Sequence, residues 1–525
     1  MLKRNAFVFL CITAIFIVAL FFRLYGFFVN HPFWVDEFYT AAQANVLLKY
    51  GLSVFFNPAL YFEYHNITPH FLVALFFKLL GQSEWAARLP FVIIGSLIPV
   101  ATFIVSYKLF NLATALSAAL LASFSYLEIA WSRQARGYVI QQLLVLLTLL
   151  FYLRSIKKGK IPITDWFILS VLFVLGIITH STFFILIGAI FLHFVWFNRK
   201  EIHRLTKNSF LFIILGVVLL VAYFTGFFKV LFFFLNLNLF GANNLWYYHS
   251  FLWREYGLIT FLSIIGFALG FLEKRKEFSL IILYTSAFLA FLSFIFKPYV
   301  SRYLLPVFPL FLIGASYGVS SLSSMVVEKF RLKPKLLFST LIPLVITLFI
   351  IINGDKFVFK PKSFYSVNHD FREAALIDYK QIYDRIKKEN EQSEEKAAVI
   401  ETLPDRAEWY LGYGYKPLFL FRGGDIEGYT HGITRKTTYT VNKKGEKLVT
   451  ATGPILVSEV SDLMRIQKHY PRGFLFIDGA ALPQDVIGYA QNYLKKEMYV
   501  DHYPLDDNPY SIWPATLYSW GIEEQ

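Results

Sequence analysis

The chain has 525 residues, 56% of them hydrophobic and 19% aromatic, and its mean hydropathy is +0.51. A soluble globular domain does not carry so large an apolar fraction, so the composition predicts a polytopic membrane protein. The net charge is +14, and Cys11 is the only cysteine, which excludes internal disulfides and thiolate metal sites.

Positive charge is concentrated in the first part of the chain. Residues 1–353 carry 28 Lys and Arg against 11 Asp and Glu, whereas residues 354–525 carry 22 against 25. The basic residues of the first part lie in short loops between apolar runs. This pattern indicates cytoplasmic loops that contact anionic lipid headgroups, and it does not indicate nucleic-acid binding. We therefore predict a transmembrane helical domain over residues 1–353 and a soluble α/β domain over residues 354–525.

The first apolar run, Ala6–Phe28, follows Lys3 and Arg4. It resembles a signal peptide, but it is longer than one and no small-residue cleavage site follows. We therefore expect a retained first helix with a cytoplasmic N-terminus. Asp36 and Glu37 come directly after it. Adjacent carboxylates at the mouth of a span are costly and typical of a functional site, although the pair could also be an ordinary charged flank.

Four basic clusters divide the rest of the membrane part, around residues 154–160, 199–207, 274–276 and 329–335. The positive-inside rule places all four in the cytoplasm. With the first helix, the apolar segments between and around these clusters predict about eleven spans. These segments are Leu89–Lys108, Leu112–Ala130, Tyr138–Leu153, Trp166–Thr179, Thr182–Phe197, Phe210–Phe228, Leu258–Leu272, Phe278–Phe296, Tyr303–Leu322 and Leu336–Ile352.

Whether the segment His70–Leu80 crosses the membrane decides whether the number of spans is odd or even. It has about half of the roughly 20 residues that a span needs, so we expect it to lie along the outer interface with Tyr39–Leu48. If it crossed the bilayer, there would be about twelve spans, and either the acids or the tail would change side. If it does not cross, the tail and an aromatic-rich loop, Asn243–Arg254, are extracytoplasmic. The polar residues of that side are Asp36, Glu37, Glu63, His65, His70, Glu84, Glu128, Arg133, Arg136, His180, Arg254, Glu255 and Arg302.

The tail has the pattern of a small α/β domain. Ala397–Glu401 and Gly473–Ile477 are short apolar runs typical of strands. Asp405–Leu411 and Gln484–Leu494 follow them with helical spacing. The sequence contains no Gly-rich phosphate loop and no His-Glu metal helix.

The outer polar residues suggest chemistry on a phosphate. Asp36 could act as a general base. Arg136 and Arg302, with Arg133 nearby, could hold a phosphate in the bidentate fork of a guanidinium group. Tyr138 and Tyr303, which follow two of these arginines, could donate to the phosphate or pack a polyprenyl chain. Alternatively, these arginines and tyrosines could be ordinary residues of the membrane interface, and Lys297 could take the role of Arg302.

A second set of residues could line a cavity on the outer side of the membrane, or bind a divalent metal ion with Asp36. Histidines near a membrane surface are also often hydrogen-bonded turn residues, and His180 could be one. Metal dependence therefore stays open, and no other cofactor is expected. The residues of this set are Glu63, His65, His70, His180 and Glu128.

Several motifs, in order and spacing, resemble GT-C glycosyltransferases of the protein O-mannosyltransferase and lipid A aminoarabinose transferase type. The acidic motif Trp34–Glu37 resembles the first-loop motif of these enzymes. The further motifs are Thr68–Phe71, Phe77–Pro90, Trp131–Tyr138 and Arg302–Pro306. The likeness covers roughly residues 1–320.

The resemblance implies an integral-membrane, inverting glycosyltransferase that moves a hexosyl or pentosyl group from a polyprenyl-phosphate donor to a lipid, glycan or protein acceptor. The reaction would take place on the extracytoplasmic face of the cell membrane. The resemblance also implies that Asp36 is the base and that Arg136 contacts the donor phosphate. Two departures are visible: the usual His-Pro-Pro is Thr68-Pro69-His70, and Glu128 is the only acid near the second outer loop.

One alternative is a structural or assembly protein whose tail binds cell-wall components. Another is a transporter or lipid flippase of the cell envelope, which also places polar residues in the membrane. Such proteins usually contain internal repeats and interrupted helices, and neither is evident in this sequence.

Overall fold

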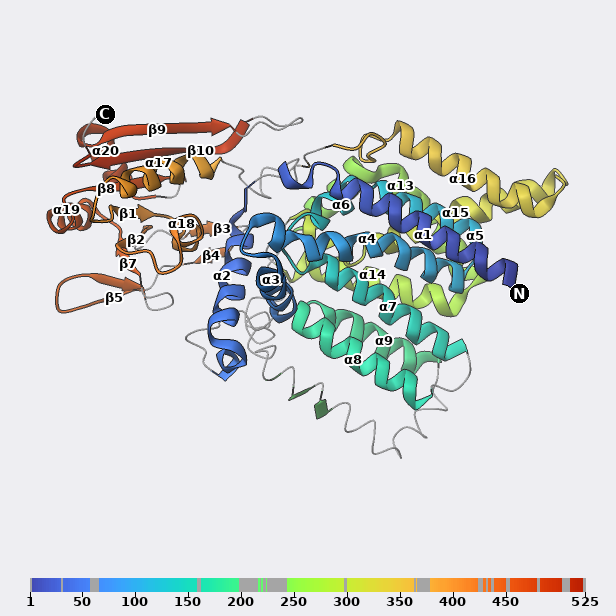
Figure 1. Ribbon diagram of the computed structural model, residues 1–525. Coiled ribbons are helices and arrows are strands. Elements are labelled where there is room, and N and C mark those ends of the chain that lie inside the picture. Colours follow the sequence, from blue (N-terminus) through green and yellow to red (C-terminus); the bar gives the residue numbers. More distant parts are fainter. Residues whose placement is uncertain are drawn as a thin grey trace. The chain divides into compact units, whose positions relative to one another are not determined.

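In the computed structural model the chain divides into two compact units, which we describe separately (Figure 1). Unit 1 comprises Met1–Phe28 and Gln43–Tyr365, and unit 2 comprises Val29–Ala42 and Ser366–Gln525. The structure describes residues 2–29, 32–56, 66–157, 162–197, 243–296, 300–362, 378–423, 439–449, 454–478, 482–502 and 510–522, with short pieces at 216–217, 219–220, 223, 365, 428–430 and 433–435.

The described part of unit 1 is mainly helical. Among its described residues, six helices are long and apolar enough to cross a membrane: α1 (Leu2–Leu24), α4 (Glu84–Leu109), α7 (Tyr138–Lys157), α13 (Leu245–Glu273), α14 (Arg275–Phe294) and α15 (Phe308–Lys329). The shorter apolar helices are α3 (Ile67–Leu80), α5 (Leu112–Phe124), α8 (Ile163–Thr179), α9 (Phe183–Phe197) and α16 (Lys335–Asn353). The predicted polytopic helical fold is thus confirmed. The predicted span Phe210–Phe228 lies almost wholly outside the described residues.

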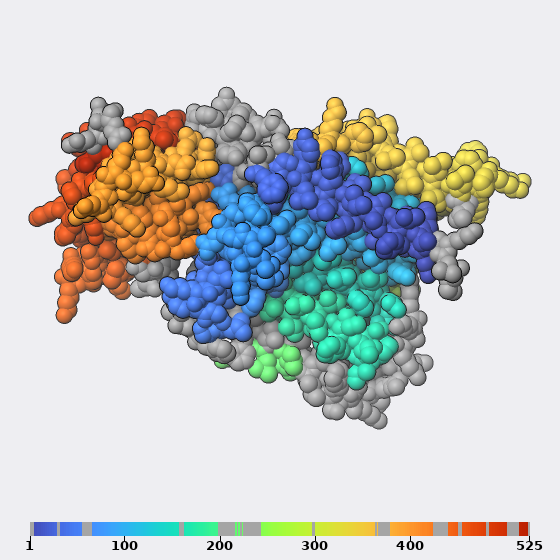
Figure 2. Space-filling model, viewed as in Figure 1, coloured from blue at the N-terminus to red at the C-terminus, as the bar shows by residue number. Residues whose placement is uncertain are grey.

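Helices α8 and α9 lie side by side (Figure 1), and their side chains form one continuous surface in Figure 2. Large apolar side chains such as Phe167 and Phe191 are exposed on these helices. Exposed apolar side chains on apolar helices are what a surface facing lipid requires.

The packing of α13 on α15 depends on small residues. A Cβ atom at Gly266 would lie 1.8 Å from the carbonyl oxygen of Gly314, so only glycine fits at this crossing. The Ser263 hydroxyl donates to the carbonyl of Phe311 at 2.6 Å across the same interface. Close approach through small residues, with a polar bond across the contact, is typical of helix association in membranes.

The predicted single segment Leu112–Ala130 is wrong, because α5 ends at Phe124 and a short helix, α6 (Tyr126–Ser132), follows. At the break, Ser125 pairs with Phe357 as an isolated β-bridge. The Tyr126 amide donates to the Lys356 carbonyl, and the Val358 amide to the Phe124 carbonyl. These bonds join the chain after α16 to unit 1, which explains why the unit ends after Tyr365 and not at the predicted boundary after residue 353.

The predicted loop Asn243–Arg254 is also wrong, since most of it forms the first turns of α13. The backbone of Tyr256 leaves the helical conformation, with φ −135° and ψ 37°. The hydroxyl of Thr260 donates to the carbonyl of Leu252 at this kink. Because the helix is interrupted here and its first turns are rich in polar and aromatic residues, the sequence pattern resembles that of a loop.

Unit 2 contains an eight-stranded mixed sheet with strand order β5-β6-β7-β2-β1-β8-β10-β9. The four strands β7, β2, β1 and β8 are parallel, and the remaining pairs are antiparallel. The predicted strands and helices of this domain are present: β1 (Ala398–Glu401), α18 (Pro404–Leu411), β8 (Gly473–Ile477) and α20 (Gln484–Tyr493). The other elements are α17 (Tyr379–Glu391), β2 (Leu418–Phe421), β3 (Gly428–Thr430), β4 (Ile433–Arg435), β5 (Tyr439–Val441), β6 (Lys447–Val449), β7 (Ile455–Val457), α19 (Val460–His469), β9 (Lys495–His502) and β10 (Tyr510–Trp520).

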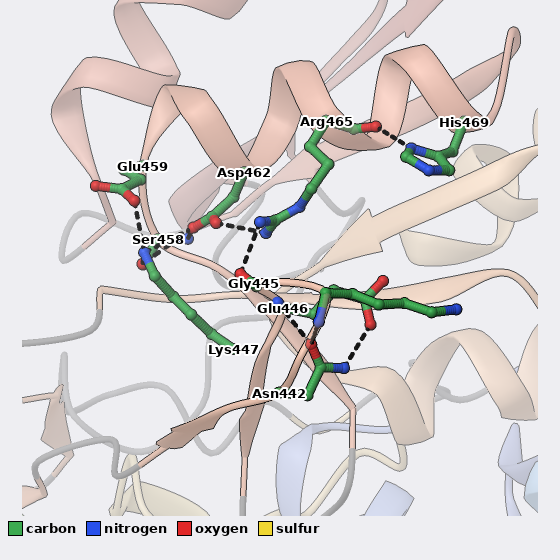
Figure 3. A network of polar contacts seen from close by, with 10 residues as sticks. Asn442, Gly445, Glu446, Lys447, Ser458, Glu459, Asp462, Arg465 and His469 are labelled. Carbon is green, nitrogen blue, oxygen red and sulfur yellow. Dashed lines mark hydrogen bonds and ion pairs between the residues drawn. The ribbon is translucent and has the colours of Figure 1, made fainter.

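A polar network joins the hairpin β5–β6 to α19 (Figure 3). The Lys447 ammonium donates to Ser458, Glu459 and Asp462 at 2.8–3.0 Å. Arg465 bonds to Asp462 at 2.8 Å and to the carbonyl of Gly445 at 2.7 Å. A three-residue edge strand such as β5 has few ladder bonds of its own, so these side chains fix the hairpin at the edge of the sheet.

Candidate functional site

The acidic motif lies at the start of α2 (Val35–Tyr50), and its local geometry follows from the sequence Phe33–Phe38. The Trp34 amide donates to the Glu37 carboxylate at 3.3 Å. This is the bond that a glutamate at the third helical position makes in a capping box. The rings of Phe33 and Phe38 meet edge to face at 5.6 Å, in the positions of a hydrophobic staple. The helix start therefore has a fixed entry angle.

The two acids lie in different environments. Glu37 is fully buried and accepts the capping bond, whereas Asp36 at the second helical position is only half-buried. The Thr40 hydroxyl donates to the Asp36 carbonyl and continues the turn. Glu37, predicted as catalytic with Asp36, thus has a clear structural role in holding the helix start on which Asp36 stands.

In unit 1, three of the predicted phosphate-binding residues come together. Arg302 lies in the short 3-10 helix η4 (Ser301–Leu304), and its Nε donates to the Tyr138 hydroxyl at 3.1 Å. The Tyr138 and Tyr303 rings meet edge to face at 5.8 Å. The Arg302 guanidinium lies over the Tyr303 ring at 5.5 Å and over the Trp131 ring at 5.8 Å. A buried guanidinium group is therefore held by the neighbouring Tyr303 and by two aromatic residues distant in the sequence, Trp131 and Tyr138.

His180 adjoins the same aromatic cluster. Its ring lies 5.7 Å from the Tyr138 ring and 6.3 Å from the Tyr303 ring. His180 Nδ1 lies 2.8 Å from the Thr182 hydroxyl, which also accepts a bond from Gln141 at 2.7 Å. His180 thus serves as a hydrogen-bonded turn residue between α8 and α9, and it also lies beside the residues predicted to hold the donor.

Arg133 and Arg136 lie in the turn between α6 and α7. Arg133 is buried, and its guanidinium contacts the rings of Phe27 and Tyr365 at 5.9 and 5.1 Å. Burial lowers the pKa of Arg133 to about 10; Tyr365 opposes this shift and the neighbouring Arg88 adds to it, so the group stays charged at neutral pH. Arg136 is half-buried, and its amide donates to the Gln134 carbonyl at 2.8 Å.

Glu128 belongs to a buried polar group that the sequence reasoning only partly anticipated. Its carboxylate accepts from Gln142 Nε2 at 2.6 Å, and the same amide nitrogen donates to the Leu305 carbonyl at 2.9 Å. Arg23, which the sequence motifs do not predict as a site residue, is fully buried and donates to the Ser132 hydroxyl at 3.0 Å. An arginine inside the otherwise apolar first helix was the available signal for this site.

Two of the predicted metal ligands, Glu63 and His65, lie outside the described residues. His70 is buried in α3. Among the residues that the structure describes, no three His, Cys, Asp or Glu side chains are grouped for a metal ion. The metal site therefore stays a prediction, as does a reaction centre shared by Asp36 of unit 2 and the arginines of unit 1.

Comparison with known proteins gives one family match. Residues 64–227 match the family model described as dolichyl-phosphate-mannose-protein mannosyltransferase. No curated protein sequence matches the chain significantly.

Solved structures resemble the whole chain. ArnT from Cupriavidus metallidurans in the apo state is 13% identical, with 98% of each chain covered and a TM-score of 0.58. The same enzyme bound to undecaprenyl phosphate is 13% identical over the same coverage, with a TM-score of 0.56. The archaeal oligosaccharyltransferase AglB from Archaeoglobus fulgidus, in complex with an inhibitory peptide and a dolichol-phosphate, is 12% identical. The match covers 94% of this chain and 73% of AglB, with a TM-score of 0.56.

These matches agree with the resemblance drawn from the sequence motifs. The chain has the fold of the GT-C membrane glycosyltransferases ArnT and AglB, and part of its membrane unit matches the mannosyltransferase family model.

Proposed function

We propose that the chain is an integral-membrane inverting glycosyltransferase. It takes a hexosyl or pentosyl group from a polyprenyl-phosphate donor and transfers it to a lipid, glycan or protein acceptor on the extracytoplasmic face of the cell membrane. The buried group of Arg302, Tyr138 and Tyr303 carries this proposal, because it offers a guanidinium group and two phenols to a phosphate. ArnT, which has the same fold, was solved with undecaprenyl phosphate bound.

The donor phosphate binds at the Arg302 group, and Arg136 and Arg133 add positive charge. Guanidinium groups suit phosphate because their fork matches its oxygens. The polyprenyl chain lies against apolar helix surfaces such as those of α8 and α9. Positive charge at the phosphate stabilises the leaving group as negative charge develops on it.

Asp36 is the general base. The acceptor oxygen or nitrogen attacks the anomeric carbon as the bond from that carbon to the phosphate oxygen breaks. The acceptor proton passes to the Asp36 carboxylate, and the polyprenyl phosphate leaves as an anion. The anomeric configuration inverts because the exchange is a single displacement. None of these steps uses a metal ion, although Glu63, His65 and His70 could still bind one.

The basic loops support the orientation that we propose. With the clusters at 154–160, 199–207, 274–276 and 329–335 in the cytoplasm, the N-terminus is cytoplasmic. Asp36 and the C-terminal domain are then extracytoplasmic. This is the side on which the lipid-linked sugar would meet its acceptor.

Replacement of Asp36 by Asn tests the proposal. The assay follows the transfer of label from radiolabelled polyprenyl-phosphate sugars, extracted from the host's membranes, to endogenous acceptors. Because a positioned base typically contributes about 10²- to 10⁴-fold, we expect D36N to lose that much rate while donor binding stays unchanged. Val35→Ala, at the exposed neighbouring position, is the control. Transfer by D36N at the wild-type rate would remove Asp36 as the base, and donor movement between leaflets without transfer would indicate a flippase.

A further inference from the structure

The segment that contains the acidic motif packs as part of the C-terminal domain. By internal contacts, Val29–Ala42 belongs with Ser366–Gln525, although more than 320 residues separate the two stretches in the sequence. The domain boundary falls inside α2, so the first turns of this helix belong to unit 2 and its later turns to unit 1. The stretch Ser366–Gln525, which contains no predicted catalytic residue, thus packs with the helix start that bears Asp36.

Aromatic rings make this contact. Two of them, Phe33 and Phe38, lie on either side of Asp36 in the sequence. Phe33 lies 4.9 Å from the ring of Trp409 on α18. Phe38 lies 5.9 Å from the ring of Tyr410 and 6.3 Å from that of Tyr379. Phe33 and Phe38 are fully buried and form the staple that fixes the entry angle of α2. The domain therefore holds the same two rings that set the direction of the helix at Asp36.

Helix α18 is itself anchored to the sheet by a buried ion-pair group. Arg406 bonds to Glu401 at 2.8 Å and to Asp478 at 2.6 Å. Its guanidinium lies between the rings of Tyr379 and Phe476, at 4.4 and 4.5 Å from their centroids. Although burial alone lowers the pKa of Arg406, the carboxylates of Asp478 and Glu401 raise it well above the ordinary arginine value. Arg406 is therefore charged at any physiological pH.

The anchor occupies the place where open α/β sheets usually bind ligands. Strand β1 lies between β2 and β8, so the chain reverses its direction of winding there, and Glu401 and Asp478 stand at the carboxyl ends of β1 and β8. The Thr402 hydroxyl donates to Asp478, and the Tyr383 hydroxyl donates to Glu401, both at 2.6 Å. Side chains of the domain itself thus bond to one another at this switch point.

From this arrangement we propose that the C-terminal domain positions the catalytic base. Trp409, Tyr410 and Tyr379 are positioning residues that hold Phe33 and Phe38, and thereby keep the Asp36 carboxylate directed at the acceptor. The inference rests on the proposed role of Asp36. It adds that transfer by this enzyme depends on a domain that need not touch donor or acceptor.

Hydrogen exchange and transfer kinetics of the full-length chain test this inference. In W409A we expect amides 33–42 to exchange about tenfold faster, because the loss of the ring releases a local opening of the helix start. We expect kcat to fall about 10- to 100-fold, since small misplacement of a catalytic group is costly, with the donor KM nearly unchanged. W409F, which keeps a ring, should recover most of both. Tyr470→Ala, at a half-exposed ring that packs on Phe419, is the matched control.

The outcomes separate this inference from the proposed function. Exchange of the β1 and β8 amides reports whether W409A has kept its fold, and F33L tests the contact from the other side if it has not. If D36N abolishes transfer while W409A and F33L retain wild-type kcat and exchange at 33–42, the positioning role is wrong and the base assignment stands. If D36N transfers normally, the proposed function fails whatever the exchange shows.

Discussion

Each unit contains a buried arginine, and the two arginines have different contacts. In unit 2, Arg406 is paired with the carboxylates of Glu401 and Asp478. In unit 1, Arg302 donates to the Tyr138 hydroxyl and lies over the rings of Trp131 and Tyr303. An arginine paired with two acids stabilises a fold, whereas a guanidinium group beside phenol side chains suits the binding of a phosphate. We propose a structural role for the first arginine and a binding role for the second.

The largest effect is expected at Arg406. R406A would leave Glu401 and Asp478 buried without their cation, which typically costs about 3–5 kcal/mol. Hydrogen exchange at the β1 and β8 amides measures this loss, with Arg385→Ala at a partly exposed ion pair as the control. If R406A leaves the exchange of both strands unchanged, Arg406 does not have the structural role that we propose.

At Arg302 the loss should be in transfer and not in folding. R302A removes a guanidinium group from the developing phosphate charge, and one such donor is worth about 10²- to 10³-fold in rate. Transfer of labelled sugar and binding of undecaprenyl phosphate are measured together with thermal stability. R302K tests the fork geometry, because an ammonium group cannot make the same bidentate contact. Normal transfer with reduced thermal stability would give Arg302 the same role as Arg406.

A smaller effect is expected at Glu37, which separates the two acids of the motif. E37A removes the capping bond to the Trp34 amide, which costs about 0.5–2 kcal/mol at a helix start. E37Q keeps an acceptor oxygen and should behave as the wild type in the transfer assay. A loss in E37Q as large as the one in D36N would show that Glu37 takes part in the chemistry.

The smallest effect concerns the ion pair of Lys447 in unit 2, which is more exposed than that of Arg406. A hydrogen bond from Lys447 lowers the pKa of Glu459 below its usual value of 4.5. This stabilisation is present above pH 4.5 and is lost as the pH falls through the lower pKa of the folded state. The amides of β5 and β6 should therefore exchange faster below that pH, after correction for intrinsic rates, and this pH dependence should vanish in K447M. Since exposed pairs contribute little, a large pH effect would contradict this ranking.

The sequence predicted much of this structure because its signals are local. The strand at Gly473–Ile477 agrees residue for residue with β8, and Asp405–Leu411 agrees with α18 to one residue. Tyr138, Arg302 and Tyr303 were assigned to one site from charge and family likeness, and the structure brings them together.

Features that depend on partners distant in the sequence were missed. The break at Ser125 depends on Phe357, and the buried anchor depends on the pairing of Arg406 with Asp478. The grouping of Val29–Ala42 with the tail depends on rings more than 340 residues away, such as Trp409 and Tyr410. No periodicity or motif reports contacts of this kind, because the residues involved look like ordinary charged or aromatic residues.

We propose that the acidic motif and the arginines Arg136 and Arg302 face the same side of the membrane and serve one reaction. In a Cys11→Ser background, V35C and R136C can each be labelled with a membrane-impermeant maleimide in sealed right-side-out vesicles. We predict that both positions react from outside before the vesicles are opened. Reaction of one position from outside, and of the other only after opening, would place them on opposite sides and contradict a shared reaction centre.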